Sequence, residues 1–572
     1  MELPAPTQAV PTQAAETVAE AFLVQLRRRG VDRLFVNSGT DFASLVEAYA
    51  RRKDSGLDLP DVVVCAHENL AVSMAHGSYL GDGRVQAVML HTSVGTANAV
   101  CAVFNAARSR VPVLLTAGRT PLFEHSMLGA RDAPIHWAQE MFDQAGMLRE
   151  LVKWDYELRD GAHVLDVVDR ALDIATTQPR GPVYLSLPRE VLAGPVFSSE
   201  PGAAPAPPTV AHPDPAAVAR LADHLATAQF PLLVTGDAGA DRRAVPLLAE
   251  LCRRFGIAVV ETGVRHVNVP ADHPLHAGYA VGAVLPDADV VCVLDLDVPW
   301  IQGSTAPRED AVVVQCGPDP SFTRYPMRTH RTDLTITADT TALLTALIAA
   351  LAERTVEPTR AERLAARVSG WREARARVLE EETTTDGPIT KTFLNAALTQ
   401  VRPADAVVVN EYWASPEMLG STVPGTYFGT PPAGGLGWGL PAAMGFQLAR
   451  PATTVIATLG DGAYLFANPA ACHQAMAMHH LPVLTIVCTN AHWGAVQSSA
   501  TRMYPDGHAA SAPELSPLAR LDPAPRFAAY AEASGGLGLR VTQRAELVPA
   551  LQRALRTVQD ERRHALVDVE CA

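Results

Sequence analysis

Short apolar runs rich in β-branched residues alternate along the chain with longer segments of helical periodicity. In the first third of the chain such runs are typical of buried strands. They lie at 32–40, 62–65, 86–90, 111–118 and 183–187. Alternation of strand and helix predicts a parallel sheet with helices on both faces and functional loops at the carboxyl ends of the strands.

The same alternation recurs twice. Strands are expected near 231–235, 257–261, 290–296 and 311–315, and again at 406–409, 454–459, 483–488 and 565–569. A linker rich in Pro and Ala at 198–216 precedes the first of these sets, and the charged stretch 353–382 predicts a solvated helix before the second. The fold class is therefore α/β, with a loose tail at 1–15. We expect three doubly wound parallel-sheet domains at 1–197, 198–376 and 377–572.

The most informative turn is the Gly-Asp-Gly tripeptide at 460–462, which follows the apolar strand 454–459. A roughly helical segment at 468–480 comes next, and then a second strand that ends at Asn490. Parallel strands place both loops at one edge of the sheet, so Asp461 and Asn490 can converge on one hard cation such as Mg²⁺. An ordinary α/β turn is the alternative, because the same tripeptide at 81–83 is expected to be a surface turn.

Four stretches resemble, in the same order, the motifs of thiamine-diphosphate (ThDP) enzymes. They are 66–72 (AHENLAV), 90–98 (LHTSVGTAN), 433–443 (AGGLGWGLPAA) and the unit from 460 to 490. The nearest branch contains acetolactate synthases, benzoylformate decarboxylases and 2-hydroxyacyl-CoA lyases. The usual Asn-Asn pair of the family is Thr489-Asn490 here, slightly further from the Gly-Asp-Gly turn, and the second Asn, which is normally the metal ligand, is retained.

This resemblance implies ThDP and Mg²⁺ as cofactors and gives roles to individual residues. Glu68 would share a proton with the pyrimidine N1′ and so prepare the thiazolium C2 for deprotonation. Without the resemblance, the simpler interpretation of Glu68 is a carboxylate at the start of a helix. Leu436 would wedge the cofactor into its bent shape, and Gly434 would offer a backbone carbonyl to the pyrimidine. The implied metal ligands are Asp461, Asn490 and the backbone of His492.

His91 matches the active-site histidine of the benzoylformate decarboxylase subgroup, although a lone histidine in an apolar run is more often a core residue. The resemblance implies that His91 shuttles protons to and from the cofactor-bound intermediate. Gln139 and Gln497 are further candidates for catalysis or for lining the substrate pocket. The remaining predicted contacts, mostly to the cofactor, are Thr40, Asn98, Trp413, Ala414, Gly462, Ala463 and Trp493.

The implied activity is that of a carbon–carbon lyase or carboligase. Our first hypothesis is cleavage, or the reverse condensation, of a 2-hydroxyacyl-CoA; Arg324, Arg328 and Arg331 could meet a nucleotide phosphate, although a solvated surface is the simpler interpretation. A 2-oxo acid decarboxylase, an acetolactate synthase-type carboligase, a non-catalytic subunit and a flavin oxidase of the same fold are the alternatives. The stretch 236–240 is only weakly similar to a dinucleotide-binding fingerprint, because it lacks the third glycine, so NAD or FAD binding is not expected there. Such relatives are homodimers or homotetramers whose sites are shared between chains.

Composition narrows the partners further. The formal net charge of −14 argues against nucleic acid and anionic membranes as partners, so the expected partner is a small-molecule substrate. The eight cysteines form no CxxC motif and mostly lie in apolar runs, which indicates reduced core residues and a reducing compartment. The first 15 residues contain no apolar core of a signal peptide, and no apolar run is long enough to span a bilayer. We therefore expect a cytoplasmic enzyme.

Overall fold

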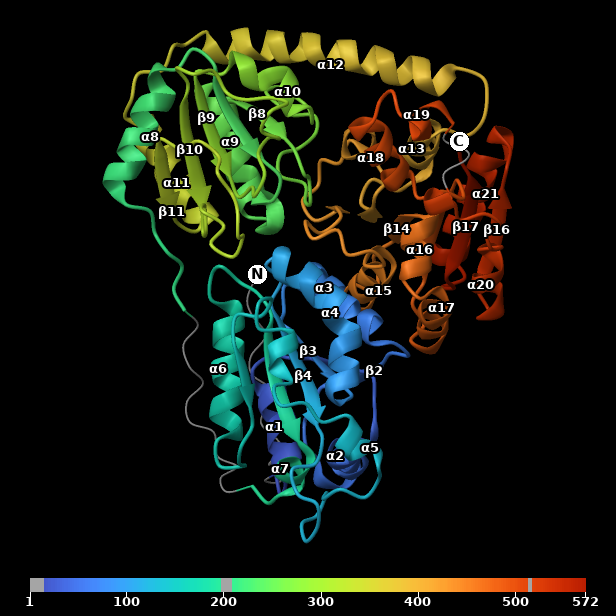
Figure 1. The fold of residues 1–572 in the computed structure, drawn as a ribbon. Helices are drawn as coiled ribbons and strands as arrows, with labels where there is room; N and C mark the ends of the chain where they lie inside the picture. Colours follow the sequence, from blue (N-terminus) through green and yellow to red (C-terminus); the bar gives the residue numbers. More distant parts are fainter. Residues whose placement is uncertain (1–14, 197–207, 513–516) are drawn as a thin grey trace. The chain divides into compact units, whose positions relative to one another are not determined.

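The computed structural model describes residues 15–196, 208–512 and 517–572, and the tail expected at 1–15 lies almost wholly outside these ranges. Three parallel sheets flanked by helices are present in this part of the chain (Figure 1). The chain divides into two compact units, 1–208 with 433–450 and 209–432 with 451–572. The α/β fold class expected from the sequence is confirmed, while the three domain limits remain predictions.

The first unit is built on a six-stranded sheet with the order β2-β1-β3-β4-β6-β5. Its strands are β1 (Arg33–Val36), β2 (Asp61–Val64), β3 (Gln86–Leu90), β4 (Val113–Arg119), β5 (Asp155–Glu157) and β6 (Val183–Pro188). Its helices are α1 (Val18–Arg28), η1 (Thr40–Phe42), α2 (Ala43–Ser55), α3 (Glu68–Asp82), α4 (Thr92–Arg108), α5 (Ile135–Ala138), η2 (Ala145–Met147), α6 (Val164–Thr176), α7 (Arg189–Ala193) and α15 (Gly439–Ala449). Strands β3, β4 and β6 are buried throughout, which explains their continuous apolar runs.

Helix α15 packs closely against α3 because glycines lie where the two helices cross. A Cβ on Gly77 of α3 would lie 1.9 Å from the carbonyl oxygen of Ala442. A Cβ on Gly445 of α15 would lie 1.9 Å from the carbonyl oxygen of Met74. A larger residue at either position would push the backbones apart. This packing places the glycine-rich segment 433–438 in the first unit.

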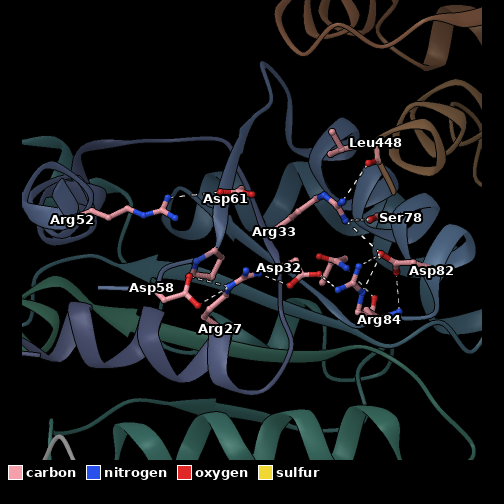
Figure 2. A network of polar contacts seen from close by, with 12 residues as sticks. Arg27, Asp32, Arg33, Arg52, Asp58, Asp61, Ser78, Asp82, Arg84 and Leu448 are labelled. Carbon is pink, nitrogen blue, oxygen red and sulfur yellow. Dashed lines mark hydrogen bonds and ion pairs between the residues drawn. The ribbon is translucent and has the colours of Figure 1, made fainter. Parts of the chain in front are cut away.

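An ion-pair network lies at the amino ends of the first strands (Figure 2). Arg33, at the start of β1, donates to the carbonyl oxygen of Leu448 on α15. Its neighbour Asp32 pairs with Arg27 of α1 and with Arg84, which precedes β3. The network therefore stabilises the end of the sheet opposite to the loops that carry the candidate chemistry.

The second unit contains two sheets, with the orders β11-β10-β9-β7-β8 and β13-β12-β14-β15-β17-β16. The first sheet comprises β7 (Pro231–Thr235), β8 (Ala258–Glu261), β9 (Val290–Leu294), β10 (Val312–Gly317) and β11 (Leu334–Thr337), with α8 (Pro215–Thr227), η3 (Ala238–Ala240), α9 (Ala244–Phe255), α10 (Val281–Val284), η4 (Leu285–Asp287) and α11 (Thr340–Ala352). Helix α12 (Arg360–Thr384) follows it and is largely exposed, in agreement with the solvated helix expected at 353–382.

The second sheet of this unit comprises β12 (Val407–Glu411), β13 (Tyr427–Phe428), β14 (Val455–Gly460), β15 (Val483–Thr489), β16 (Leu537–Val541) and β17 (Ala565–Glu570). Its helices are α13 (Lys391–Val401), α14 (Pro416–Leu419), α16 (Asp461–Phe466), α17 (Pro469–Met478), α18 (Gly494–Met503), α19 (His508–Ser511), η6 (Pro517–Ala519), α20 (Ala528–Ala533) and α21 (Arg544–Gln559). Parallel pairing of β14 with β15 brings Gly460 opposite Cys488, so both functional loops leave the same edge.

Several local expectations need correction. The helical segment expected at 468–480 agrees with α17, but the sequence analysis missed the short helix α16, which begins directly at Asp461. The linker expected at 198–216 lies partly outside the described residues, and α8 already begins at Pro215. The edge strands β5, β11, β13 and β16 escaped the sequence analysis because they are short or only partly buried. The tripeptide at 81–83 does end a helix, with Gly83 in the left-handed region.

Other expectations hold within the described ranges. All eight cysteines are free thiols, and all except Cys101 are buried. Among these residues no helix combines the length and apolar character that crossing a bilayer requires.

Candidate functional site

Glu68 opens helix α3 in the first unit and is held there by α4. The side chain of His67 accepts the backbone N–H of Asn69 at 3.1 Å, and this cap fixes where the helix begins. Glu68 is 9% exposed, and its Oε2 accepts a hydrogen bond from Asn98 Nδ2 at 3.2 Å. Asn98, predicted to orient the cofactor, therefore orients the carboxylate of Glu68.

His91 follows strand β3 and precedes α4, as the sequence indicated, and it is paired with Asp41. Its Nδ1 lies 2.6 Å from Oδ1 of Asp41, a carboxylate that is only 3% exposed. Oδ2 of Asp41 accepts the backbone N–H of Thr92 at 3.3 Å. The hydrogen bond that His91 donates to Asp41 raises the pKa of His91 above its ordinary value of 6.5, in spite of burial, and the charge of Glu68 acts in the same direction. The pair with Asp41 therefore favours the charged form of His91.

Two glycines make room for this pair. A Cβ on Gly39 would lie 2.1 Å from Nδ1 of His91, and one on Gly118 would lie 1.7 Å from Oδ2 of Asp41. The sequence analysis missed Asp41, although it chose its neighbour Thr40, which is exposed at the start of η1. The available signal was a carboxylate in the loop after β1, at the same sheet edge as the end of β3.

Gln139 meets the other side of the His91 ring. Its Nε2 lies 3.3 Å from Nε2 of His91, and its backbone carbonyl accepts a 2.6 Å hydrogen bond from Ser93 Oγ. The Oε1 of Gln139 is buried and has no hydrogen-bond partner among the described residues. In the imidazolium form of His91 both ring nitrogens carry a proton and donate. A half-turn of the Gln139 amide presents Oε1 to the Nε2–H of that form. The predicted pair His91 and Gln139 is therefore brought together.

The glycine-rich segment that carries Gly434 and Leu436 is clamped by α4. Asn105 donates from Nδ2 to the carbonyl oxygen of Gly435 at 2.8 Å and accepts the backbone N–H of Gly435 at 3.1 Å. Gly434 has a φ of +62°, in the left-handed region that favours glycine. Leu436 is partly exposed, so its side chain is available to contact a ligand.

In the second unit, Asp461 forms the centre of a backbone cradle. Its Oδ1 accepts the N–H of Gly462 at 2.8 Å, and its Oδ2 accepts those of Asn490 and Ala491 at 3.1 and 2.7 Å. Asn490 Oδ1 accepts the N–H of His492 at 3.0 Å. The loops after β14 and β15 therefore meet, and the structure brings the three predicted metal ligands together.

The donor set of this cradle fits Mg²⁺. Asp461 is 4% exposed, and burial raises its pKa, while the backbone hydrogen bonds lower it. No lysine or arginine of the described ranges forms an ion pair with Asp461, so a cation would relieve the cost of burying its charge. These ranges contain no group of three or more His, Cys, Asp or Glu side chains suited to a metal. Further oxygen ligands would come from the backbone and a bound diphosphate.

The other predicted contacts of this unit divide into two groups. Trp493 lies over Gly462, where an added Cβ would be 2.2 Å from the indole ring, and Ala463 is buried in α16. Gln497 is partly exposed on α18. The side chain of Trp413 instead packs in the core, and the N–H of Ala414 is donated to Asn410 Oδ1 at 2.9 Å. The N–H of Ala414 is therefore used inside the fold, and the contacts predicted for Trp413 and Ala414 with the cofactor stay predictions.

Comparison with known proteins shows the family to which a chain with these two groups of residues, around Glu68 and around Asp461, belongs. Models of three domains of thiamine pyrophosphate enzymes match the chain: the N-terminal TPP binding domain at 16–147, the central domain at 218–347 and the C-terminal TPP binding domain at 410–569. A benzoylformate decarboxylase from Pseudomonas aeruginosa is 30% identical, with 94% of this chain and 97% of that protein aligned. The chain belongs to the thiamine pyrophosphate enzyme family. It is a ThDP-dependent enzyme, as the resemblance implied.

Its relatives catalyse different reactions. A sulfoacetaldehyde acetyltransferase from Rhodobacter capsulatus is 28% identical over 94% of this chain and 92% of that protein. An acetolactate synthase large subunit from Mycobacterium tuberculosis is 27% identical over 95% and 94%. The solved structure of a benzoylformate decarboxylase from Polynucleobacter necessarius matches the fold with a TM-score of 0.78 at 22% identity, covering 98% of this chain and 99% of that one. Family membership thus leaves decarboxylation, carboligation and acyl transfer open.

Proposed function

We propose that this ThDP- and Mg²⁺-dependent enzyme is a carbon–carbon lyase that decarboxylates a 2-oxo acid. The observation that carries this choice is the Asp41–His91 pair at the same sheet edge as Glu68. A protonated imidazole at this edge supplies a proton to the carbon that loses carbon dioxide, and protonation favours release of an aldehyde over capture by a second carbonyl compound. The relative at 30% identity is named a benzoylformate decarboxylase, which agrees with this choice.

The residues around Glu68 and those around Asp461 have distinct tasks in this proposal. ThDP, when bound, supplies the carbon nucleophile and accepts the electrons released with carbon dioxide. Glu68, oriented by Asn98, holds a proton against the pyrimidine, and Leu436 limits the space available to the cofactor. Asp461 and Asn490 would hold Mg²⁺, which would supply positive charge to a bound diphosphate. His91 delivers the proton, and Gln139 holds its ring in place.

The first hypothesis from the sequence, a 2-hydroxyacyl-CoA substrate, gains no support from Arg328 and Arg331, two of the three arginines named for it. Arg328 donates to the carbonyl oxygens of Asp297 and Leu296 and to Gln315. Arg331 donates to three carbonyl oxygens and to Asp333. Both guanidinium groups are therefore used inside the second unit and are not arranged for a nucleotide phosphate.

A substrate panel tests the proposal. Purified protein with ThDP and Mg²⁺ is offered pyruvate, benzoylformate and a 2-hydroxyacyl-CoA, and carbon dioxide, aldehyde, acetolactate and acyl-CoA products are measured. We expect carbon dioxide and aldehyde in equal amounts from a 2-oxo acid, and loss of both in the Glu68→Gln variant. Acetolactate as the main product, or turnover of the CoA ester alone, would contradict decarboxylation.

The family resemblance also leads us to propose a homodimer or homotetramer in which each site uses Glu68 of one chain and Asp461 of another. Mixing the inactive variants Glu68→Gln and Asp461→Ala, after dissociation and reassembly, should then restore activity. About one quarter of wild-type activity is expected, because half of the dimers are mixed and one site in each is intact. Each variant reassembled alone is the control, and no recovery on mixing would show that each site uses one chain only.

A further inference from the structure

Thr489 replaces the first asparagine of the family's usual pair, and the structure shows a partner for it. Its Oγ1 donates to Oδ1 of Asp568 on the neighbouring strand β17 at 2.7 Å. Its backbone carbonyl accepts the N–H of Cys571 at 2.8 Å. The last residue of β15 is therefore held by both its side chain and its backbone, directly before the predicted metal ligand Asn490.

Asp568 is a carboxylate with no exposure to solvent, and such a group requires compensation. Besides the Thr489 hydroxyl, a charged partner is present, because Arg540 Nη1 on β16 donates to Oδ2 of Asp568 at 2.6 Å. Arg540 also donates from Nη2 to Glu570 at 2.7 Å, and the Glu570 side chain is 57% exposed. A row of Thr489, Asp568 and Arg540 thus crosses the adjacent strands β15, β17 and β16.

This row ends at the cradle around Asp461. The next residues after Thr489 are Asn490 and Ala491, whose N–H groups both bond to Asp461, and Ala491 has a φ of +55°. A non-glycine residue in the left-handed region persists only where its surroundings hold it. Anchoring Thr489 supplies that restraint on one side of the turn, and the bonds to Asp461 supply it on the other.

We propose that Asp568 is a positioning residue for the Mg²⁺ site, acting through the hydroxyl of Thr489 to hold Asn490 in place. This inference rests on the proposed ThDP–Mg²⁺ function. Asp568 is not among the predicted metal ligands, and the threonine–aspartate pair anchors the metal loop at the position of the first asparagine of the family's usual pair.

The test is metal affinity, measured apart from turnover. Mg²⁺ is titrated into protein saturated with ThDP, and binding is followed by calorimetry and by the fluorescence of Trp493, which lies over Gly462. Thr489→Val removes the hydroxyl at almost constant volume, and Asp568→Asn removes the charge. We expect roughly tenfold weaker Mg²⁺ binding in each, as for other residues that orient metal ligands. Turnover should return towards the wild-type value when Mg²⁺ is raised to saturation.

Glu570→Gln is the matched control, since it removes the exposed carboxylate that accepts from Arg540 and leaves Asp568 in place. The Mg²⁺ affinity of this variant should equal that of the wild type. The double variant Thr489→Val/Asp568→Asn should bind Mg²⁺ no more weakly than the worse single variant, because both changes break one contact. Should Asp568→Asn not fold, Thr489→Val decides alone. Wild-type affinity in a folded Thr489→Val protein overturns the inference but not the proposed function, whereas a wild-type protein that binds no Mg²⁺ with ThDP overturns both.

Discussion

Replacing Glu68 with glutamine is expected to lower turnover by roughly 10²- to 10⁴-fold, the range for loss of an acid–base group. The amide keeps the shape of the side chain and can still accept from Asn98, but it cannot share a proton with the pyrimidine. The step affected is activation of the cofactor itself. The decisive measurement is therefore exchange of the C2 proton of added ThDP for deuterium, followed by NMR after rapid acid quenching, and this exchange should slow in parallel with turnover.

Glu261→Gln serves as the matched control. Glu261 is another buried carboxylate that accepts a hydrogen bond from an asparagine, in this case Asn268 Nδ2 at 2.7 Å, but it belongs to the central sheet. Its replacement should leave C2 exchange per folded molecule unchanged. If Glu68→Gln protein binds ThDP and exchanges the C2 proton at the wild-type rate, the role proposed for Glu68 is wrong. If ThDP exchanges its C2 proton no faster with the wild-type protein than in free solution, the result favours the non-catalytic alternative.

Replacing Asp41 with asparagine is expected to reduce decarboxylation by about 10²-fold at neutral pH, the lower end of the range for a proton-transfer residue. Asp41 raises the pKa of His91, so the imidazole stays protonated to higher pH in the wild type. Without that carboxylate the pKa of His91 falls. Because activity needs the protonated form, the alkaline limb of the pH–rate profile should move to lower pH in the variant.

The groups that set this titration are few and can be checked separately. Asp41 and Glu68 favour the charged form of His91, burial opposes it, and His136 is the nearby histidine whose own pKa is lowered in part by His91. Asp143→Asn is the control, since Asp143 is a half-exposed carboxylate paired with Arg149 in the loop after Gln139. Its pH–rate profile should match the wild type. An unshifted alkaline limb in Asp41→Asn would mean that His91 is not the titrating donor.

The local sequence was enough to predict those parts of the candidate site that depend on consecutive residues. Apolar runs located the strands that precede Glu68, His91, Asp461 and Asn490, and the carboxyl end of a parallel strand must be a loop. Strands β3, β14 and β15 are buried almost throughout, whereas only Val63 is buried in the edge strand β2. The cradle of N–H groups around Asp461 likewise follows from two such loops at one edge. Amphipathic patterning did not find the edge strands β5, β11, β13 and β16, which are short or only partly buried.

Tertiary structure decided the contacts between side chains that are distant in sequence. Asp41 reaches His91 only because Gly39 and Gly118 leave space on adjacent elements. Asp568 reaches Thr489 only because β17 pairs with β15. The sequence by itself predicted the fold class, since this depends on local pattern and strand ends, and its motifs resembled those of the family to which the chain belongs. The packing of the sheets determined which buried charges meet, because a carboxylate acquires its role from the partners that compensate its burial, and no local pattern specifies those partners.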